Sequence, residues 1–110
     1  MLQTSSACQF DRPLSYRNVL DGSAPGWFDT NNEAKPWAQI ALAGDAEISS
    51  IVLVNRYEYQ PDQDEFQWAV PLKIQLSTDG KTWTDAATID KAEAVMRVDL
   101  SGKQRARHVR

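Results

Sequence analysis

The sequence predicts an all-β fold built on an antiparallel sheet with one solvated face. Within residues 71–77, Leu72, Ile74 and Leu76 recur at every second position, and a strand with this period buries one face and exposes the other to water. The polar face carries Lys73, Gln75 and Ser77. Asp79-Gly80 then favours the positive φ angles of a hairpin turn, and residues 82–84 begin a return strand. Other short strand-like runs between turn signals follow the spacing typical of a β-sandwich or barrel.

The first third of the chain predicts one strand, a helical turn and a long loop. Residues 4–10 predict a first strand, and residues 15–20 are too short and polar for more than a helical turn, which Asp21-Gly22 ends. Residues 21–36 concentrate glycine, proline and small polar residues, so they predict a long structured loop.

Two strands are expected in the middle of the chain. Residues 37–42 predict one strand, which Gly44-Asp45 stops. Residues 48–58 predict the longest strand, and the uninterrupted apolar run at residues 51–54 predicts that both of its faces are covered. A long loop is expected over residues 59–66.

The last quarter of the chain predicts one complete strand and the opening of another. Residues 95–100 alternate again, with Met96, Val98 and Leu100 directed inward. Residues 107–110 predict the beginning of a further strand without a partner. Because such a strand would present unpaired backbone groups, we expect either that the chain is a fragment or that another segment completes the sheet.

Length and charge restrict the classes of function. A chain of 110 residues supports a single domain, residues 1–110, with one hydrophobic core. The formal net charge of -3 disfavours nucleic-acid binding, and the basic residues within 103–110 are expected to form a solvated strand face or turn rather than a tail that binds polyanions. The sequence has no apolar run of membrane-spanning length and no signal-peptide pattern, so we expect no membrane insertion and a soluble chain, either unprocessed or excised from a longer precursor.

The single cysteine, Cys8, excludes an internal disulfide and a cysteine-based zinc site. A catalytic thiol would need a histidine partner, and the only histidine in the sequence is His108. A small, half-buried strand residue is the simpler interpretation of Cys8, and we do not expect an enzyme.

Five stretches resemble a known family in their order and spacing. They are Asn18–Gly22 followed by Trp27, then residues 36–42, 48–56, 70–83 and 106–110. Together they resemble the discoidin family, also called the coagulation factor 5/8 C-type domain, which is related to carbohydrate-binding modules. The resemblance implies a galactose-binding-like jelly-roll β-sandwich whose loops at one end bind sugars, lipid head groups or proteins. It also implies a secreted or cell-surface protein, and one further strand after Arg110, so that this chain lacks the last strand of its family.

The resemblance further implies a structural calcium ion held by the carbonyl of Asn18, the carboxylate of Asp21 and the carbonyl of Ser23. Hard cations prefer such oxygen ligands. Asp21 has an alternative role as a turn residue whose carboxylate accepts local N–H groups. Two departures from the family lower the coordination number, because Pro25 stands where a threonine is usual and the C-terminal ligand is absent.

The ligand-binding residues implied by the resemblance and by the loop composition lie around residues 57–68. Arg56 offers paired hydrogen bonds to sugar hydroxyls or a carboxylate, and an ion pair with Glu58 or Asp62 as a surface arginine is the equally weighted alternative. Phe28 replaces a histidine found in galactose-binding relatives, which puts galactose specificity in doubt but keeps an apolar ring for stacking on a sugar. The predicted ligand-binding set is Phe28, Arg56, Glu58, Gln60 and Trp68.

The aromatic residues and acceptors of this loop suit a sugar, because C–H faces pack on rings while carboxylates and amides take hydroxyls. Trp27 and Trp68 are the tryptophans expected to contact a ligand, whereas Trp37 and Trp83 are expected to pack in the core or on the sheet. The acidic residues of the loop also fit a glycosidase, which needs two carboxylates, but a solvated acidic rim is the preferred interpretation.

These observations predict a non-catalytic carbohydrate-binding module whose partner is a glycan or glycoconjugate. The alternative is a protein-interaction or structural accessory domain of a larger enzyme or surface protein. Binding to anionic lipids is disfavoured by the net negative charge and by loops without a basic cluster.

Overall fold

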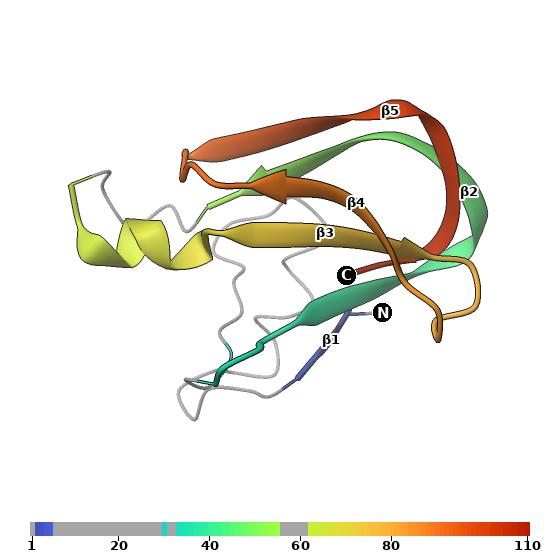
Figure 1. Cartoon of the computed structure of the whole chain (residues 1–110), viewed down its shortest axis with the longest axis horizontal. Coiled ribbons are helices and arrows are strands. Elements are labelled where there is room, and N and C mark those ends of the chain that lie inside the picture. Colours follow the sequence, from blue (N-terminus) through green and yellow to red (C-terminus); the bar gives the residue numbers. More distant parts are fainter. Residues whose placement is uncertain (1, 6–29, 31–32, 56–61) are drawn as a thin grey trace. The chain divides into compact units, whose positions relative to one another are not determined.

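The structure, a computed structural model, describes residues 2–5, 30, 33–55 and 62–110 (Figure 1). These residues form five β-strands and one short 3-10 helix, and the strand pairings with a defined register are antiparallel, which confirms the predicted all-β class. The elements are β1 (Leu2–Thr4), β2 (Ala38–Val54), η1 (Asp64–Ala69), β3 (Leu72–Ser77), β4 (Thr84–Ile89) and β5 (Val95–Val109). Within the described ranges, no helix has the length and apolar character needed to cross a membrane.

The chain divides into two compact units, which are described separately: Met1–Ala41 with Arg110, and Leu42–Val109. In the first unit, β1 pairs with the beginning of β2, in the register Leu2 opposite Ile40. Ser5 continues this pairing, because its N–H donates to the carbonyl of Trp37 (2.8 Å) and its hydroxyl accepts the N–H of Trp37 (3.0 Å). The first strand therefore begins before the predicted residue 4, and residues 6–10 lie outside the described part of the chain.

In the second unit, the strands lie in the order β2-β5-β3-β4. The hairpin predicted from the alternating residues is present: β3 pairs with β4 from Leu72 opposite Ile89 to Leu76 opposite Thr84. Ile74 and Leu76 are buried, as their alternation predicts. A register shift between Ile74 and Gln75 interrupts the ladder once.

The two segments predicted as separate strands near the C-terminus are a single strand. β5 begins at Val95 and continues to Val109, and its last residues pair with β3, with His108 opposite Ser77. The prediction of an unpartnered strand opening at residue 107 is therefore wrong. Gly102 lies within β5 at a φ of 72°, a backbone conformation that glycine adopts without steric cost, so the strand continues past a position that most residues would not tolerate.

The strand predicted to stop at Gly44-Asp45 also continues. β2 runs without a break from Ala38 to Val54, and cross-strand ion pairs link it to β5 (Asp45 to Arg105 and Glu47 to Lys103, each 3.6 Å between nitrogen and oxygen). Charged residues in this strand therefore mark its solvated face rather than its end.

The expectation that both faces of residues 51–54 are covered is wrong. Val52 and Val54 are 52% and 74% exposed, while Ile51 and Leu53 are half-buried. Side chains of an antiparallel strand point alternately to the two faces of its sheet even when all of them are apolar, because the backbone sets their direction. Where one face is open to solvent, every second apolar side chain is therefore exposed.

The core of the second unit lies between β3 and β5. Leu76, Leu100 and Ala106 are buried together, and side chains from β2, β4 and β5 pack against them. Met96 and Leu100 are buried and Val98 is half-buried, which confirms the predicted inward face of residues 95–100. The partly buried residues around this cluster are Ile48, Ile51, Ala86, Ala87, Val98 and Val109.

The β3–β4 turn is longer than a two-residue hairpin and buries Ser77, which the alternation had placed on the wetted face. Ser77 is 4% exposed, and its hydroxyl accepts the N–H of Gly80 (2.8 Å) and donates to Asp79 Oδ1 (3.0 Å). Asp79 Oδ1 also accepts the N–H groups of Lys81 and Thr82, both at 2.8 Å. Of the two predicted turn residues only Gly80 has a positive φ, and β4 begins at Thr84.

Hydrogen bonds to the carboxylate set the ionisation of Asp79. The N–H of Thr82 contributes most, followed by the N–H of Lys81 and the hydroxyl of Ser77, and together they lower the pKa of Asp79 to about 2. The charged carboxylate is thus part of the turn that joins β3 to β4.

Candidate functional site

One end of the second unit carries η1, which is the described part of the segment that the sequence predicts to bind a ligand. Figure 1 shows the end of β2, η1, the beginning of β3, the end of β4 and the beginning of β5 at this end. Two contacts fix the arrangement: Leu72 pairs with Ile89, and the N–H of Asn55 donates to the carbonyl of Ala94 (2.9 Å). The end of β2, the beginning of β3 and the β4–β5 loop therefore lie at one end of the unit.

Residues 64–69, predicted as part of a loop, form the 3-10 helix η1. Its Phe66 is 4% exposed and anchors the helix, while the side-chain amide of Asn55 donates to the carbonyl of Phe66 (3.0 Å). The N–H of Phe66 donates to the carbonyl of Gln63, and the N–H of Val70 to that of Gln67, both at 3.1 Å. One buried ring and one amide thus hold this short helix against the end of β2.

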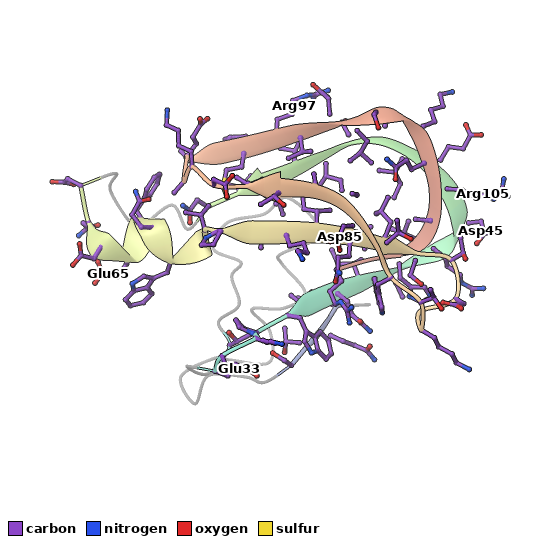
Figure 2. The ribbon with its side chains drawn as sticks, in the orientation of Figure 1. Glu33, Asp45, Glu65, Asp85, Arg97 and Arg105 are labelled. Atoms are coloured by element: carbon purple, nitrogen blue, oxygen red, sulfur yellow. The ribbon has the colours of Figure 1, made fainter. Side chains whose placement is uncertain are left out.

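The helix exposes a tryptophan, and an acidic residue lies in the same row of side chains. Trp68 is 72% exposed on η1. Side chains three residues apart on a 3-10 helix lie one above the other, so Glu65 and Trp68 share one row while Phe66 and Ala69 form the inward row. Glu65 projects from η1 in Figure 2. From the sequence, Glu65 is only one residue of an acidic rim. Its spacing of three residues from Trp68 becomes informative because the segment forms a 3-10 helix.

Of the predicted ligand-binding residues, the structure describes only Trp68. Phe28, Arg56, Glu58 and Gln60 lie outside the described residues. The contact between Asn55 and Phe66 nevertheless brings together the two described flanks of the segment that carries Arg56, Glu58 and Gln60. The predicted metal ligands Asn18, Asp21 and Ser23 also lie outside the described residues, as does Trp27.

The two remaining tryptophans differ from each other. Trp83 is half-buried, and its ring meets that of His108 edge-on with 6.3 Å between centroids, which confirms that Trp83 packs on the sheet. Trp37 is 36% exposed, so it is not a core residue. The backbone N–H and carbonyl of Trp37 form hydrogen bonds with Ser5, and its indole lies on the surface.

A cavity of about 240 Å³ lies at the same end as η1, beside the β4–β5 loop. Its charged lining is largely paired, because Lys91 meets Glu93 at 3.9 Å and Arg97 meets Asp99 at 3.0 Å. Within the described ranges, no group of three or more histidine, cysteine, aspartate or glutamate residues is arranged to hold a metal ion.

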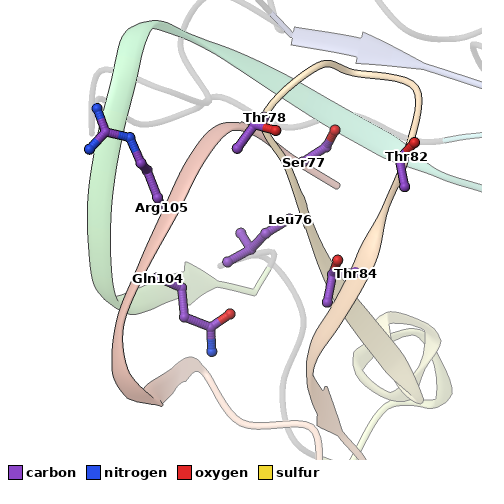
Figure 3. A pocket seen from close by; sticks show the side chains of 7 residues that line it. All are labelled: Leu76, Ser77, Thr78, Thr82, Thr84, Gln104 and Arg105. Carbon is purple, nitrogen blue, oxygen red and sulfur yellow. The ribbon is translucent and has the colours of Figure 1, made fainter.

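A larger cavity of about 390 Å³ lies at the opposite end, beside the β3–β4 turn (Figure 3). Its lining contains no aromatic residue, and its floor is the buried Leu76. The guanidinium of Arg105 points away from Leu76 in Figure 3 and pairs with Asp45, and the hydroxyl of Ser77 is engaged by the turn. Since the exposed ring of Trp68 lies at the other end, η1 and its flanking loops are the candidate site.

Comparison with known sequences identifies the family. Residues 18–110 match the F5/8 type C sequence family described as NedA-like, galactose-binding domain. The chain belongs to this family. The match begins at Asn18, where the stretches that resemble the discoidin family also begin, and it includes η1 and all of β2 to β5. No curated protein matches the chain.

Solved structures establish the fold of this F5/8 type C chain as a galactose-binding-like β-sandwich. CpGH89CBM32-5 from Clostridium perfringens, in complex with GalNAc-β-1,3-galactose, aligns with a TM-score of 0.77 at 14% identity, over 99% of this chain and 79% of that one. The fucose-binding module SpX-3 of Streptococcus pneumoniae aligns with a TM-score of 0.73 at 19% identity, over 99% and 78%. The family 32 carbohydrate-binding module of NanJ from C. perfringens, in complex with galactose, aligns with a TM-score of 0.72 at 14% identity, over 99% and 77%. The predicted fold class is confirmed.

Proposed function

We propose that this F5/8 type C domain is a non-catalytic carbohydrate-binding module that holds a glycan at the end of the second unit that carries η1. The observation that carries the proposal is the exposed ring of Trp68, 72% accessible on a helix held by Phe66 and Asn55. An exposed indole on an anchored helix offers a flat apolar face, which suits the C–H face of a pyranose ring. The similar solved structures in complex with galactose and with GalNAc-β-1,3-galactose support the choice of a sugar.

The proposed mechanism of binding combines a stacking surface with hydrogen-bonding groups. The sugar places its C–H face on Trp68. Arg56, Glu58 and Gln60 donate to and accept from its hydroxyls. Because a shallow surface buries little of a polar ligand, the affinity for a single sugar is expected to be weak.

The arrangement of the acidic residues supports a binding role rather than a hydrolytic one. Glycosidases need two carboxylates that flank the scissile bond across a cleft. Asp62, Asp64 and Glu65 instead lie along one short segment, and the cavity at this end is lined by the β4–β5 loop. The similar solved structures named above are binding modules, which supports the same conclusion.

The proposal includes a structural calcium ion at Asn18, Asp21 and Ser23. One carboxylate and two backbone carbonyls are the oxygen donors that a hard cation prefers, but they fill only part of the six to eight positions of Ca²⁺. Further oxygens, from water or from other residues, would complete the shell. A secreted or cell-surface location accords with such an ion and with a glycan partner.

Binding to a glycan array, followed by calorimetric titration with the sugars that respond, tests the proposal. Trp68→Ala is expected to weaken binding roughly fivefold to tenfold, because an aromatic contact of this kind contributes about 1–1.4 kcal/mol. Trp83→Phe, at the opposite end of the unit, is the control and should bind like the wild type. A folded wild-type protein that binds no sugar would refute the proposal.

A protein-interaction role is the second candidate, and three exposed valines favour it. Val54, Val95 and Val52 are 74%, 54% and 52% exposed, and the contact of Asn55 with Ala94 places the first two near each other. If no sugar on the glycan array binds, this apolar surface is the preferred candidate for binding a protein partner. Val54→Asp would then reduce association with the protein partner while leaving the fold intact.

A further inference from the structure

The proposed sugar site has a strong acidic bias. Within the described residues 62–72 there are three carboxylates, those of Asp62, Asp64 and Glu65, and no lysine or arginine. In the β4–β5 loop at the same end, Lys91 is paired with Glu93 at 3.9 Å. The local charge that a ligand meets at η1 is therefore negative.

One of these carboxylates is placed beside the stacking ring. The rows of η1 are Asp64 with Gln67, Glu65 with Trp68, and Phe66 with Ala69. Phe66 is buried, so the first two rows face outward, and Glu65 is half-buried in the same row as the exposed ring of Trp68. A ligand stacked on Trp68 meets the carboxylate of Glu65 before it meets that of Asp64.

We propose that Glu65 is a specificity-determining residue, which accepts hydroxyls of a neutral sugar or an amino sugar stacked on Trp68 and disfavours saccharides that carry a carboxylate. This inference rests on the proposed function. An ionised carboxylate only accepts hydrogen bonds, so it suits the hydroxyl and ammonium donors of a sugar and repels a uronate at the same position. The proposed ligand class is thus neutral or cationic glycans, with uronic and sialic acids excluded.

The size of the effect follows from Coulomb's law. Two like charges about 6 Å apart near an aqueous surface change an equilibrium roughly threefold, and up to about tenfold where water is partly displaced. Because Glu65 is only half-buried, salt screens this interaction, and the discrimination decreases as salt rises toward about 1 M.

Three sugars of nearly the same shape test the proposal: the methyl glycosides of galactose, galactosamine and galacturonic acid, at a pH where the carboxylates and the amine are ionised. For the wild type, we expect affinity to fall in the order galactosamine, galactose, galacturonic acid. Glu65→Gln keeps the side-chain size and an acceptor oxygen but loses the charge, so it should weaken galactose binding and bring the affinities of the other two sugars about threefold or more closer to that of galactose. Asp64→Asn, which removes a charge from the neighbouring row, is the matched control. It should reduce the spread of affinities among the three sugars less than Glu65→Gln does.

The outcomes separate the two proposals. If the wild type binds galactose and Glu65→Gln leaves the spread among the three sugars unchanged, the role of Glu65 is overturned while the sugar-binding function stands. If Asp64→Asn reduces the spread as much as Glu65→Gln, the discrimination belongs to the general field of the loop, and the assignment to Glu65 is overturned. If the folded wild type binds none of the three sugars or any other glycan, both proposals fail.

Discussion

Alanine substitutions at three glycines would separate two reasons why the fold needs glycine, namely a positive φ angle and the lack of space for a Cβ. Gly80 has a φ of 73°, and a Cβ added there would lie 3.1 Å from Nε2 of His108. Gly102 has a nearly identical φ of 72°, with no described atom within 4 Å of its added Cβ. Gly44 has no such neighbour and no positive φ. The three substitutions therefore report strain with contact, strain alone, and neither.

The expected magnitudes follow from these geometries. Placing alanine in the left-handed region costs about 1 kcal/mol, so Gly102→Ala should lower the free energy of unfolding by that amount. At Gly80 the ring of His108 must also move from its edge-on contact with Trp83, which adds roughly 0.5–1.5 kcal/mol, for a total near 2 kcal/mol. Gly44→Ala should raise stability by about 0.5 kcal/mol, because glycine within a strand loses more backbone entropy on folding than alanine.

Urea denaturation followed by tryptophan fluorescence gives the three values, with an unchanged m-value as the condition for comparing midpoints. In a His108→Ala background, the difference between Gly80→Ala and Gly102→Ala should shrink to a few tenths of a kcal/mol, since the contact is then absent. The reasoning is refuted if Gly80→Ala costs no more than Gly102→Ala, or if the additional cost persists without the imidazole.

Three further predictions concern the turn, the site and the metal. Because the folded-state pKa of Asp79 is about 2, below its ordinary value of 3.8, its carboxylate stabilises the fold above pH 3.8, and this contribution is lost as pH falls toward 2; Asp79→Asn should flatten the acid limb of a stability-pH curve, and an unchanged limb would contradict this. Asn55→Ala leaves the carbonyl of Phe66 without its amide donor and should weaken sugar binding severalfold at a stability cost of about 1 kcal/mol, measured by calorimetry and urea denaturation on the same samples; equal sugar affinity in both proteins would show that this hydrogen bond does not position the site. Calcium in excess should raise the melting temperature of the wild type but not of Asp21→Asn, with magnesium as the control ion, and an equal rise in both proteins would place the ion elsewhere.

The candidate site was only partly accessible to sequence reasoning. Trp68 was identifiable because an aromatic residue among polar neighbours in a connecting segment suits a sugar ligand. The position of Glu65 in the same row as Trp68 was not identifiable, because residues 62–69 show no helical periodicity long enough to recognise. The 3-10 turn depends on burial of Phe66 and on the amide of Asn55. Both of those contacts come from the packing of segments that are apart in the sequence.

By itself, the sequence determined the antiparallel all-β class, the β3–β4 hairpin and the inward face of residues 95–100. These features follow from the alternation of apolar and polar residues and from the residues that favour turns, both of which act over a few residues. Only the tertiary structure decided that β2 passes through Gly44-Asp45, that β5 passes through Gly102, and that Ser77 is buried in the turn. The physical reason is that a strand continues or ends according to the partner that takes its backbone hydrogen bonds, here β5 beside β2 and β3 beside the last residues of β5.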